Sequence, residues 1–272
     1  MKRLFSKLKT EGDWTMKFES ALWTDIGVER ETNQDSMCIK HALTEQGEIL
    51  MGVVCDGMGG LELGELASAE VVRAFGNWFE TELPGMLSLP DYRDEIRYRW
   101  ERIIQEQNQN ILEYGREHRI TLGTTVTAML FFPDGQYILA HAGDTRAYRI
   151  TNWSAELLTQ DHTLVAQMVR DGRITEAQAD NHPDRNVLVR CIGVSRSVRP
   201  DIRCDSAQTD ECYLLCSDGF RHEVSRDELQ RNFAPDVVRD ESELTRRLEH
   251  MTRVNIERGE MDNVSALVIK LS

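Results

Sequence analysis

The order of apolar and polar positions divides the chain into strand-like and helix-like stretches. An apolar run from Ile49 to Cys55, which contains β-branched residues, predicts a buried strand that ends at Asp56. Four of the eight residues after Asp56 are glycine, and they predict a sharp turn. Beyond the turn, apolar residues recur at helical spacing: Leu66, Ala69, Val72, Phe75, Trp78 and Phe79. The stretch therefore predicts a strand, a turn and a helix, with a carboxylate at the end of the strand.

The same patterns predict elements along the rest of the chain. Residues 68–119 contain two long helical patterns, broken near Leu83-Pro84 and Leu89-Pro90, and residues 242–258 predict another helix. Residues 161–186 predict short helices and loops. Further strands are predicted over residues 16–27, 36–43, 124–132, 136–141, 145–150, 187–190, 198–204, 212–216 and 264–271. Neighbouring strands joined by tight turns favour antiparallel sheets with helices packed outside them, which is an α+β layering.

Composition bounds the class of protein. Acidic residues exceed basic ones by 46 − 32 = 14, which argues against a basic face that binds nucleic acid. No stretch approaches the roughly 18 apolar residues of a membrane span, and the N-terminus lacks the apolar core of a secretory signal. The six cysteines form no CxxC pair, so reduced core thiols are expected. We expect a cytoplasmic protein with no integral membrane segment, in which residues 1–12 are an N-terminal tail and residues 13–272 are one domain.

Five acids share one kind of position, at the edge of an apolar strand beside a small or polar residue: Asp35, Asp56, Asp144, Asp218 and Asp262. Each taken singly is an ordinary turn signal. If they converge on one edge of the sheets, their repulsion has to be balanced by cation charge. Oxygen-only ligands, with the Gly57 carbonyl as a further one, favour Mg²⁺ or Mn²⁺ over Zn²⁺.

Such a site suits the hydrolysis of a phosphate ester. Two ions about 3.5–4 Å apart hold a bridging water, lower its pKa and aim it at phosphorus. The reaction also needs a guanidinium that grips the phosphoryl oxygens, and Arg30 lies five residues before Asp35. An isolated arginine in a loop is otherwise a surface charge.

A series of short motifs occurs in one order along the chain: GVERETNQD, VVCDGMGG followed by GELAS, GTTVTA, AHAGDTRAY, LTQDHT, LLCSDG and DNVSALV. Together they resemble the bacterial branch of the metal-dependent type 2C protein serine/threonine phosphatases, from about residue 22 to the C-terminus. The resemblance implies a four-layer αββα sandwich, in which two antiparallel β-sheets are flanked by helices. It also implies a centre of two Mn²⁺ or Mg²⁺ ions at one end, and a third, weaker ion.

The resemblance assigns roles to the acids. Asp56 matches the acid that bridges both metals, and the Gly57 carbonyl matches the backbone ligand of the second. Asp218 and Asp262 match the remaining carboxylates of the first metal. Asp144 matches the acid that holds the third ion together with Asp218.

The resemblance also assigns roles to Asp35 and Arg30, and the residue before Asp35 departs from the family pattern. Asp35 matches an acid that contacts the second metal, and Gln34 stands where some members have a glutamate ligand. Arg30 matches the phosphate-binding arginine. Catalysis is therefore expected to depend on Arg30, Asp56 and Asp218.

The general acid has no assignment from the motifs. Met58 and Leu61 stand where some members have histidine. His162 and His141 are candidates, although a lone histidine near a strand end is more often structural; a metal-bound water is the alternative proton donor.

The resemblance implies a protein serine/threonine phosphatase that acts on phosphorylated proteins and opposes a bacterial Ser/Thr kinase. Residues 164–189 resemble the mobile flap beside the active site. Two alternatives stay open: a non-catalytic signalling or binding module with the same fold, and a phosphatase for the phosphoserine switch of an anti-sigma antagonist system.

Two thiols flank expected ligands, since Cys55 precedes Asp56 and Cys216 lies two residues before Asp218. One hypothesis is that oxidation or heavy-metal capture at Cys216 disturbs Asp218. The alternative is that both are small buried apolar residues.

Overall fold

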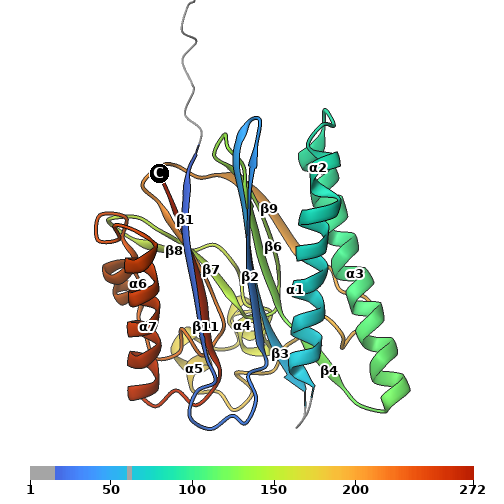
Figure 1. The fold of residues 1–272 in the computed structure, drawn as a ribbon. Helices are drawn as coiled ribbons and strands as arrows, with labels where there is room; N and C mark the ends of the chain where they lie inside the picture. The colour runs from blue at the N-terminus through green and yellow to red at the C-terminus, as the bar shows by residue number, and fades with distance from the viewer. Residues whose placement is uncertain (1–15, 60–62) are drawn as a thin grey trace, which may run out of the picture.

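The computed structural model describes residues 16–59 and 63–272. The predicted N-terminal tail, residues 1–12, lies outside the described residues. Two antiparallel sheets form the middle of the molecule, and helices cover both outer faces (Figure 1). This arrangement confirms the α+β sandwich of four layers.

Each sheet is antiparallel throughout. The first has the order β1-β11-β10-β7-β8, with bounds Phe18–Asp25, Val264–Leu271, Cys212–Cys216, Arg146–Ile150 and Ala155–Leu157. The second has the order β2-β3-β5-β6-β9, with bounds Asp35–Thr44, Gly47–Gly59, Val126–Phe131, Gln136–Ala142 and Asp201–Ser206. A short strand, β4 (Leu122–Thr124), pairs with the end of β3.

The helices lie on the outer faces of the two sheets. The second sheet is covered by α1 (Gly64–Thr81) and α3 (Tyr92–His118), with the single turn α2 (Leu83–Met86) between them. The first sheet is covered by α6 (Arg226–Phe233) and α7 (Glu241–Glu257). Two short helices, α4 (Leu164–Arg170) and α5 (Glu176–Asp180), lie in the segment between β8 and β9.

Strand β3 lies between two cores, which explains its continuous apolar run. Ile49, Met51 and Val53 pack in the cluster between the second sheet and its helices. Leu50 and Val54 point the opposite way and pack in the cluster between the two sheets. Because successive side chains of a strand face opposite sides, a strand buried on both faces has no polar alternation.

The prediction that this strand ends at Asp56 is wrong. Strand β3 continues to Gly59, because Gly57 pairs with Thr124 and Gly59 pairs with Leu122. Asp56 therefore lies inside a strand. The partner strand is distant in sequence, so the apolar pattern of residues 49–55 gave no sign of the extension.

Other boundaries differ from the prediction. Residues 187–190 form no strand, since only Leu188 makes an isolated bridge, to Thr163, and the flanking Val187 and Val189 are exposed. The strand expected at 198–204 lies at 201–206, immediately after Pro200, which has no amide hydrogen for a strand ladder. Strand β8 and helix α6 were missed.

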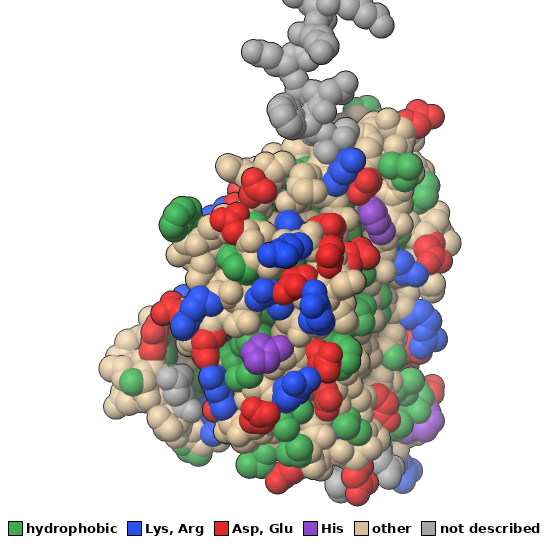
Figure 2. Space-filling model, turned by 60° about the vertical axis from the view of Figure 1, so that its left-hand side comes forward, with side chains coloured by type: hydrophobic (Ala, Val, Ile, Leu, Met, Phe, Trp, Pro, Cys, Tyr) green, Lys and Arg blue, Asp and Glu red, His purple; other side chains and the backbone are tan. Residues whose placement is uncertain are grey.

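The outer face that carries α6 and α7 has acidic and basic side chains interspersed (Figure 2). On α7 they pair along the helix, as in Arg246 with Glu243 and Arg253 with Glu249. Within residues 16–59 and 63–272, none of the helices has the length and apolar character needed to cross a bilayer.

Candidate metal centre

Both sheets bring their acids to the same end of the sandwich, the lower end in Figure 1. Asp35 begins β2 and lies directly opposite Asp56 of β3 in the strand register. Asp144 lies between β6 and β7. Asp218 follows β10 by two residues and Asp262 precedes β11 by two, and these strands are neighbours. The sequence-predicted acids are therefore gathered in one region.

The pKa values of three of these acids report their burial and mutual repulsion. Burial raises the pKa of Asp56 well above 3.8, and Asp35, Asp218, Asp144 and Asp262 raise it further. Burial and the charge of Asp218 raise the pKa of Asp35 to about 8, although the Ser265 and Ser217 hydroxyls oppose the shift. The same two causes raise the pKa of Asp144 to about 7. The carboxylates therefore interact electrostatically, as a site for cations requires.

Two carboxylate oxygens in this region are buried and lack a hydrogen-bond partner among the described residues: Asp35 Oδ2 and Asp218 Oδ1. Unpaired buried charge is costly, and a divalent cation is the natural partner for such oxygens. The residues present therefore fit Mn²⁺ or Mg²⁺. Among the described residues, no group of three or more aspartate, glutamate, histidine or cysteine side chains is placed closely enough to hold a metal ion.

Two glycines allow the loops of the site to approach one another closely. A β-carbon at Gly57 would lie 2.2 Å from the Gly64 carbonyl oxygen and 2.6 Å from that of Gln34. A β-carbon at Gly219 would lie 2.3 Å from the Asn263 carbonyl oxygen. No other residue fits at either position without moving backbone.

Arg30 lies at the rim of this region. Its Nε and Nη2 donate to Asp262 Oδ1 and Oδ2 at 2.8 and 2.6 Å, and the side chain is 51% exposed. These hydrogen bonds are the main cause that raises the pKa of Arg30 above 12.5. The predicted phosphate-binding arginine therefore lies beside a predicted metal ligand.

A cavity of about 1180 Å³ opens beside the acids. Arg30, Asp144, His222 and Asp262 line one part of it. The segment 164–189 lines another part, through residues that include Arg170 and Arg185. The two ends of this segment are held together by hydrogen bonds from Leu164 N–H to the Val187 carbonyl and from Val189 N–H to the His162 carbonyl, both 2.8 Å.

Similarity to known proteins identifies the family of this chain. The family model of protein phosphatase 2C matches residues 28–259. This chain belongs to the protein phosphatase 2C family. The resemblance seen in the motifs is confirmed.

Individual members of the 2C family match over nearly the whole chain. The serine/threonine phosphatase Stp of Listeria welshimeri is 32% identical over 251 residues, which are 91% of this chain and 93% of that protein. The crystal structure of the serine/threonine phosphatase Stp1 from Staphylococcus aureus has a TM-score of 0.80 at 27% identity, covering 100% of both chains. The catalytic domain of the serine/threonine protein phosphatase PstP, in complex with two manganese ions, has a TM-score of 0.75 at 26% identity, covering 94% of this chain and 99% of that one.

The two histidines considered as general acids have structural partners in this 2C-family protein. His141 is buried, bonds to the Thr127 hydroxyl and the Gln160 carbonyl, and has its pKa lowered to about 4 by burial. His162 accepts a hydrogen bond from Gly143 N–H and bonds to Asp201. Neither is among the described residues that line the cavity.

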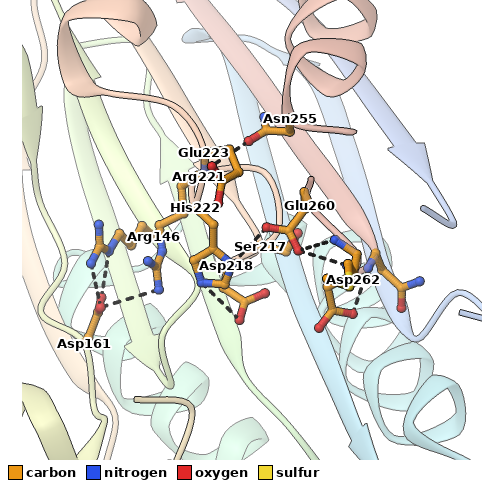
Figure 3. Close-up of polar contacts among 12 residues, drawn as sticks. Arg146, Asp161, Ser217, Asp218, Arg221, His222, Glu223, Asn255, Glu260 and Asp262 are labelled. Atoms are coloured by element: carbon orange, nitrogen blue, oxygen red, sulfur yellow. Dashed lines mark hydrogen bonds and ion pairs between the residues drawn. The ribbon is translucent and has the colours of Figure 1, made fainter. Parts of the chain in front are cut away.

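Sequence reasoning missed His222 and Glu260. His222 lines the cavity, with Nδ1 3.0 Å from Glu260 Oε2 and Nε2 3.7 Å from Asp218 Oδ2 (Figure 3). Their nearness to Asp218 and Asp262 in sequence, four and two residues away, was the available signal. A second missed group is the ion pair of Arg146 with Asp161, which Figure 3 shows at the opposite side of Asp218.

The buried thiols of this 2C-family protein are expected to resist oxidation. Cys55 and Cys216 are both fully buried, and burial raises the pKa of Cys216 to about 12 and that of Cys55 well above 9.0. Because the thiolate is the reactive form, brief peroxide treatment is expected to leave phosphatase activity unchanged. Equal activity of treated and untreated protein, for the parent and Cys216→Ala, is the expected result. Inactivation of the parent alone would restore the redox hypothesis.

Proposed function

We propose that this chain removes phosphate from phosphoserine and phosphothreonine in proteins, in a reaction that depends on Mn²⁺ or Mg²⁺. The observation that carries the proposal is the gathering of five carboxylates at one end of the sandwich. Two of them have a buried oxygen with no hydrogen-bond partner among the described residues. Family membership supports it, as does the manganese-bound PstP structure.

The ligands would come from both sheets. We assign Asp56, Asp218 and Asp262 to one ion, and Asp56, the Gly57 carbonyl and Asp35 to the other. A third ion would be held by Asp144 and Asp218. When bound, such ions lower the pKa of a coordinated water and stabilise negative charge on a phosphoryl group.

Arg30 orients the phosphoryl group in this proposal. Its guanidinium presents parallel N–H donors, which match two oxygens of a phosphate as they match those of Asp262. A cation on Asp262 would compete with Arg30 for the same two oxygens, and a bound cation would then release the guanidinium. The released guanidinium then lies at the cavity rim, where it can grip a phosphoryl group and hold phosphorus in line for attack.

Substitution of Arg30 should therefore affect substrate binding most. Arg30→Ala is expected to raise KM for a phosphopeptide about 10- to 100-fold, the value of one or two hydrogen bonds to a charged group, with a smaller change in kcat. Steady-state kinetics at saturating Mn²⁺ measure this, with Arg253→Ala on α7 as the control. An unchanged KM would remove Arg30 from the site.

The segment 164–189 is proposed as a flap that contacts the protein substrate. It lines the cavity and is joined at its base, so it is placed to cover a bound phosphopeptide. A bacterial Ser/Thr kinase is the proposed source of the substrates.

We also propose a cytoplasmic location. The basis is the free state of all six cysteines, which suits a reducing compartment.

The proposal is tested by assaying release of phosphate from a phosphoserine peptide and from a chromogenic phosphate ester. Activity with Mn²⁺ that EDTA abolishes is the expected result. Metal binding without hydrolysis of either substrate would favour the non-catalytic module instead.

The raised pKa values also predict a pH dependence. In the folded metal-free protein, Asp35 holds its proton up to about pH 8, whereas in the unfolded chain it loses it near 3.8. The folded state therefore binds the extra proton, and stability falls as pH rises across this window. In EDTA, we expect the Tm of the parent to fall relative to that of Asp35→Asn between pH 6.5 and 8, and the difference in Tm to stay constant above pH 8. This range lies above the window in which His141 titrates, since its pKa is lowered from 6.5 to about 4. A constant difference in Tm across that range would contradict the prediction.

A further inference from the structure

The hydrogen bond between His222 and Glu260 connects the two loops that carry Asp218 and Asp262 (Figure 3). On one side, His222 belongs to the turn after β10, where its backbone N–H donates to the Asp218 carbonyl at 3.1 Å. Its imidazole Nε2 lies 3.7 Å from the Asp218 carboxylate. The backbone of His222 is therefore held within the Asp218 loop, and its ring lies beside the Asp218 carboxylate.

On the other side, Glu260 organises the turn before β11. Its side chain is nearly buried, and Oε1 accepts the backbone N–H groups of Met261 and Asp262, both at 2.9 Å. Its Oε2 bonds to His222 Nδ1 at 3.0 Å. One carboxylate thus fixes the backbone of Asp262 and binds the imidazole from the opposite loop.

The Asp218 loop has an independent support, so its fold does not depend on His222. Asn255 of α7 is fully buried; its Nδ2 donates to the Phe220 carbonyl at 2.9 Å, and its Oδ1 accepts Glu223 N–H at 3.3 Å. These bonds hold the backbone on both sides of His222. Loss of the imidazole is therefore expected to free the position of Asp218 relative to Asp262 without unfolding the loop.

We propose that His222 and Glu260 are positioning residues that set the spacing of Asp218 and Asp262 for cation binding. The inference rests on the proposed function, because it assumes that these two acids share an ion. Residues that hydrogen-bond behind metal ligands change affinity by about 10- to 100-fold when they are replaced. The same range is expected here.

The test is Mn²⁺ affinity, measured by isothermal titration calorimetry on the full 272-residue chain. His222→Ala is expected to weaken binding about 10- to 100-fold. His222→Asn places a side-chain N–H where Nδ1–H stood and is expected to stay within about threefold of the parent, since the bond to Glu260 is kept. His250→Ala, an exposed histidine on α7, is the matched control and should bind as the parent does.

A double-variant comparison tests whether the two residues act through each other. If they do, Glu260→Ala combined with His222→Ala weakens Mn²⁺ binding by less than the product of the two single effects. Metal-free Tm values of all variants are measured alongside, because a merely structural role lowers Tm but leaves the Mn²⁺ dissociation constant unchanged.

Three outcomes overturn the inference: parent-like affinity of His222→Ala, equal weakening in His222→Ala and His222→Asn, or tighter binding in both. The third would mean that the imidazole acts on the ion by charge and not by position. A parent protein that binds no Mn²⁺ would instead remove the proposed metal centre, and this inference with it.

Discussion

Asp56→Asn is expected to abolish metal-dependent phosphatase activity and, at the same time, to raise the Tm of the metal-free protein. Asp56 lies directly opposite Asp35 in neighbouring strands, where like charges destabilise the pair. At pH 7.5 the folded metal-free protein has to keep Asp56 protonated or bury its charge beside four other acids. Asparagine has the same shape and avoids both costs.

The expected sizes follow from these costs. Relief of about 1–2 kcal/mol corresponds to a rise in Tm of roughly 2–8 °C for a chain of this size. Loss of the proposed bridging ligand removes several kcal/mol of transition-state stabilisation, so activity should fall at least about 1000-fold.

Differential scanning calorimetry in EDTA and a phosphopeptide assay in Mn²⁺ measure the two effects. Asp236→Asn, an exposed acid between α6 and α7, is the matched control and should change neither. An Asp56→Asn protein with parent activity would refute the proposed centre. A lower Tm in EDTA would show that Asp56 stabilises the fold.

Gly57→Ala is expected to have the largest effect on stability. The added methyl group would lie 2.2 Å from the Gly64 carbonyl oxygen and 2.6 Å from the Gln34 carbonyl oxygen. Both obstacles are backbone, which cannot rotate aside as a side chain does. Gly57 N–H also donates to the Gln34 carbonyl at 3.0 Å, so relief of the clash breaks a hydrogen bond. A loss of about 3 kcal/mol or more is expected.

Gly85→Ala is the matched control, since a β-carbon at Gly85 of α2 meets no atom within 4 Å among the described residues. It should leave stability unchanged or slightly higher. Urea unfolding of both variants and the parent gives the comparison. Equal midpoints for Gly57→Ala and the parent would show that the strand end can move, and that the Gly57 carbonyl is not held in place.

The sequence predicted the layers well because burial leaves a local trace. The apolar run at 49–55 predicted a strand, and the helical spacing after Glu65 predicted α1. Helix α6 was missed because few of its residues are apolar, although Ser225 and Glu228 form a capping box that is visible as a pattern. The extension of β3 through Gly59 depends on β4, about 60 residues later in the chain, and had no local trace.

In the candidate centre, too, features that depend on nearby residues could be predicted and contacts between distant residues could not. The position of Asp144, Asp218 and Asp262 at strand ends indicated that they could converge on one edge of the sheets, and the structure gathers them at one end of the sandwich. The contact of His222 with Glu260 spans 38 residues and arises because β10 and β11 are neighbours in the sheet. The pairing of β10 with β11 was not predicted, so neither residue was identified.

The hairpin of β2 and β3 has a consequence for the order in which the protein assembles. Its ladder runs from Thr44 and Gly47 beside the turn to Asp35 and Asp56 at the open end. The turn end closes the shortest loop, so pairing should propagate from there toward the acids. The last rung then brings the two carboxyl groups together, and in the metal-free protein it closes on acids whose raised pKa values keep their protons bound. Loading with metal is therefore expected to follow completion of the ladder and to release the protons that the two acids hold.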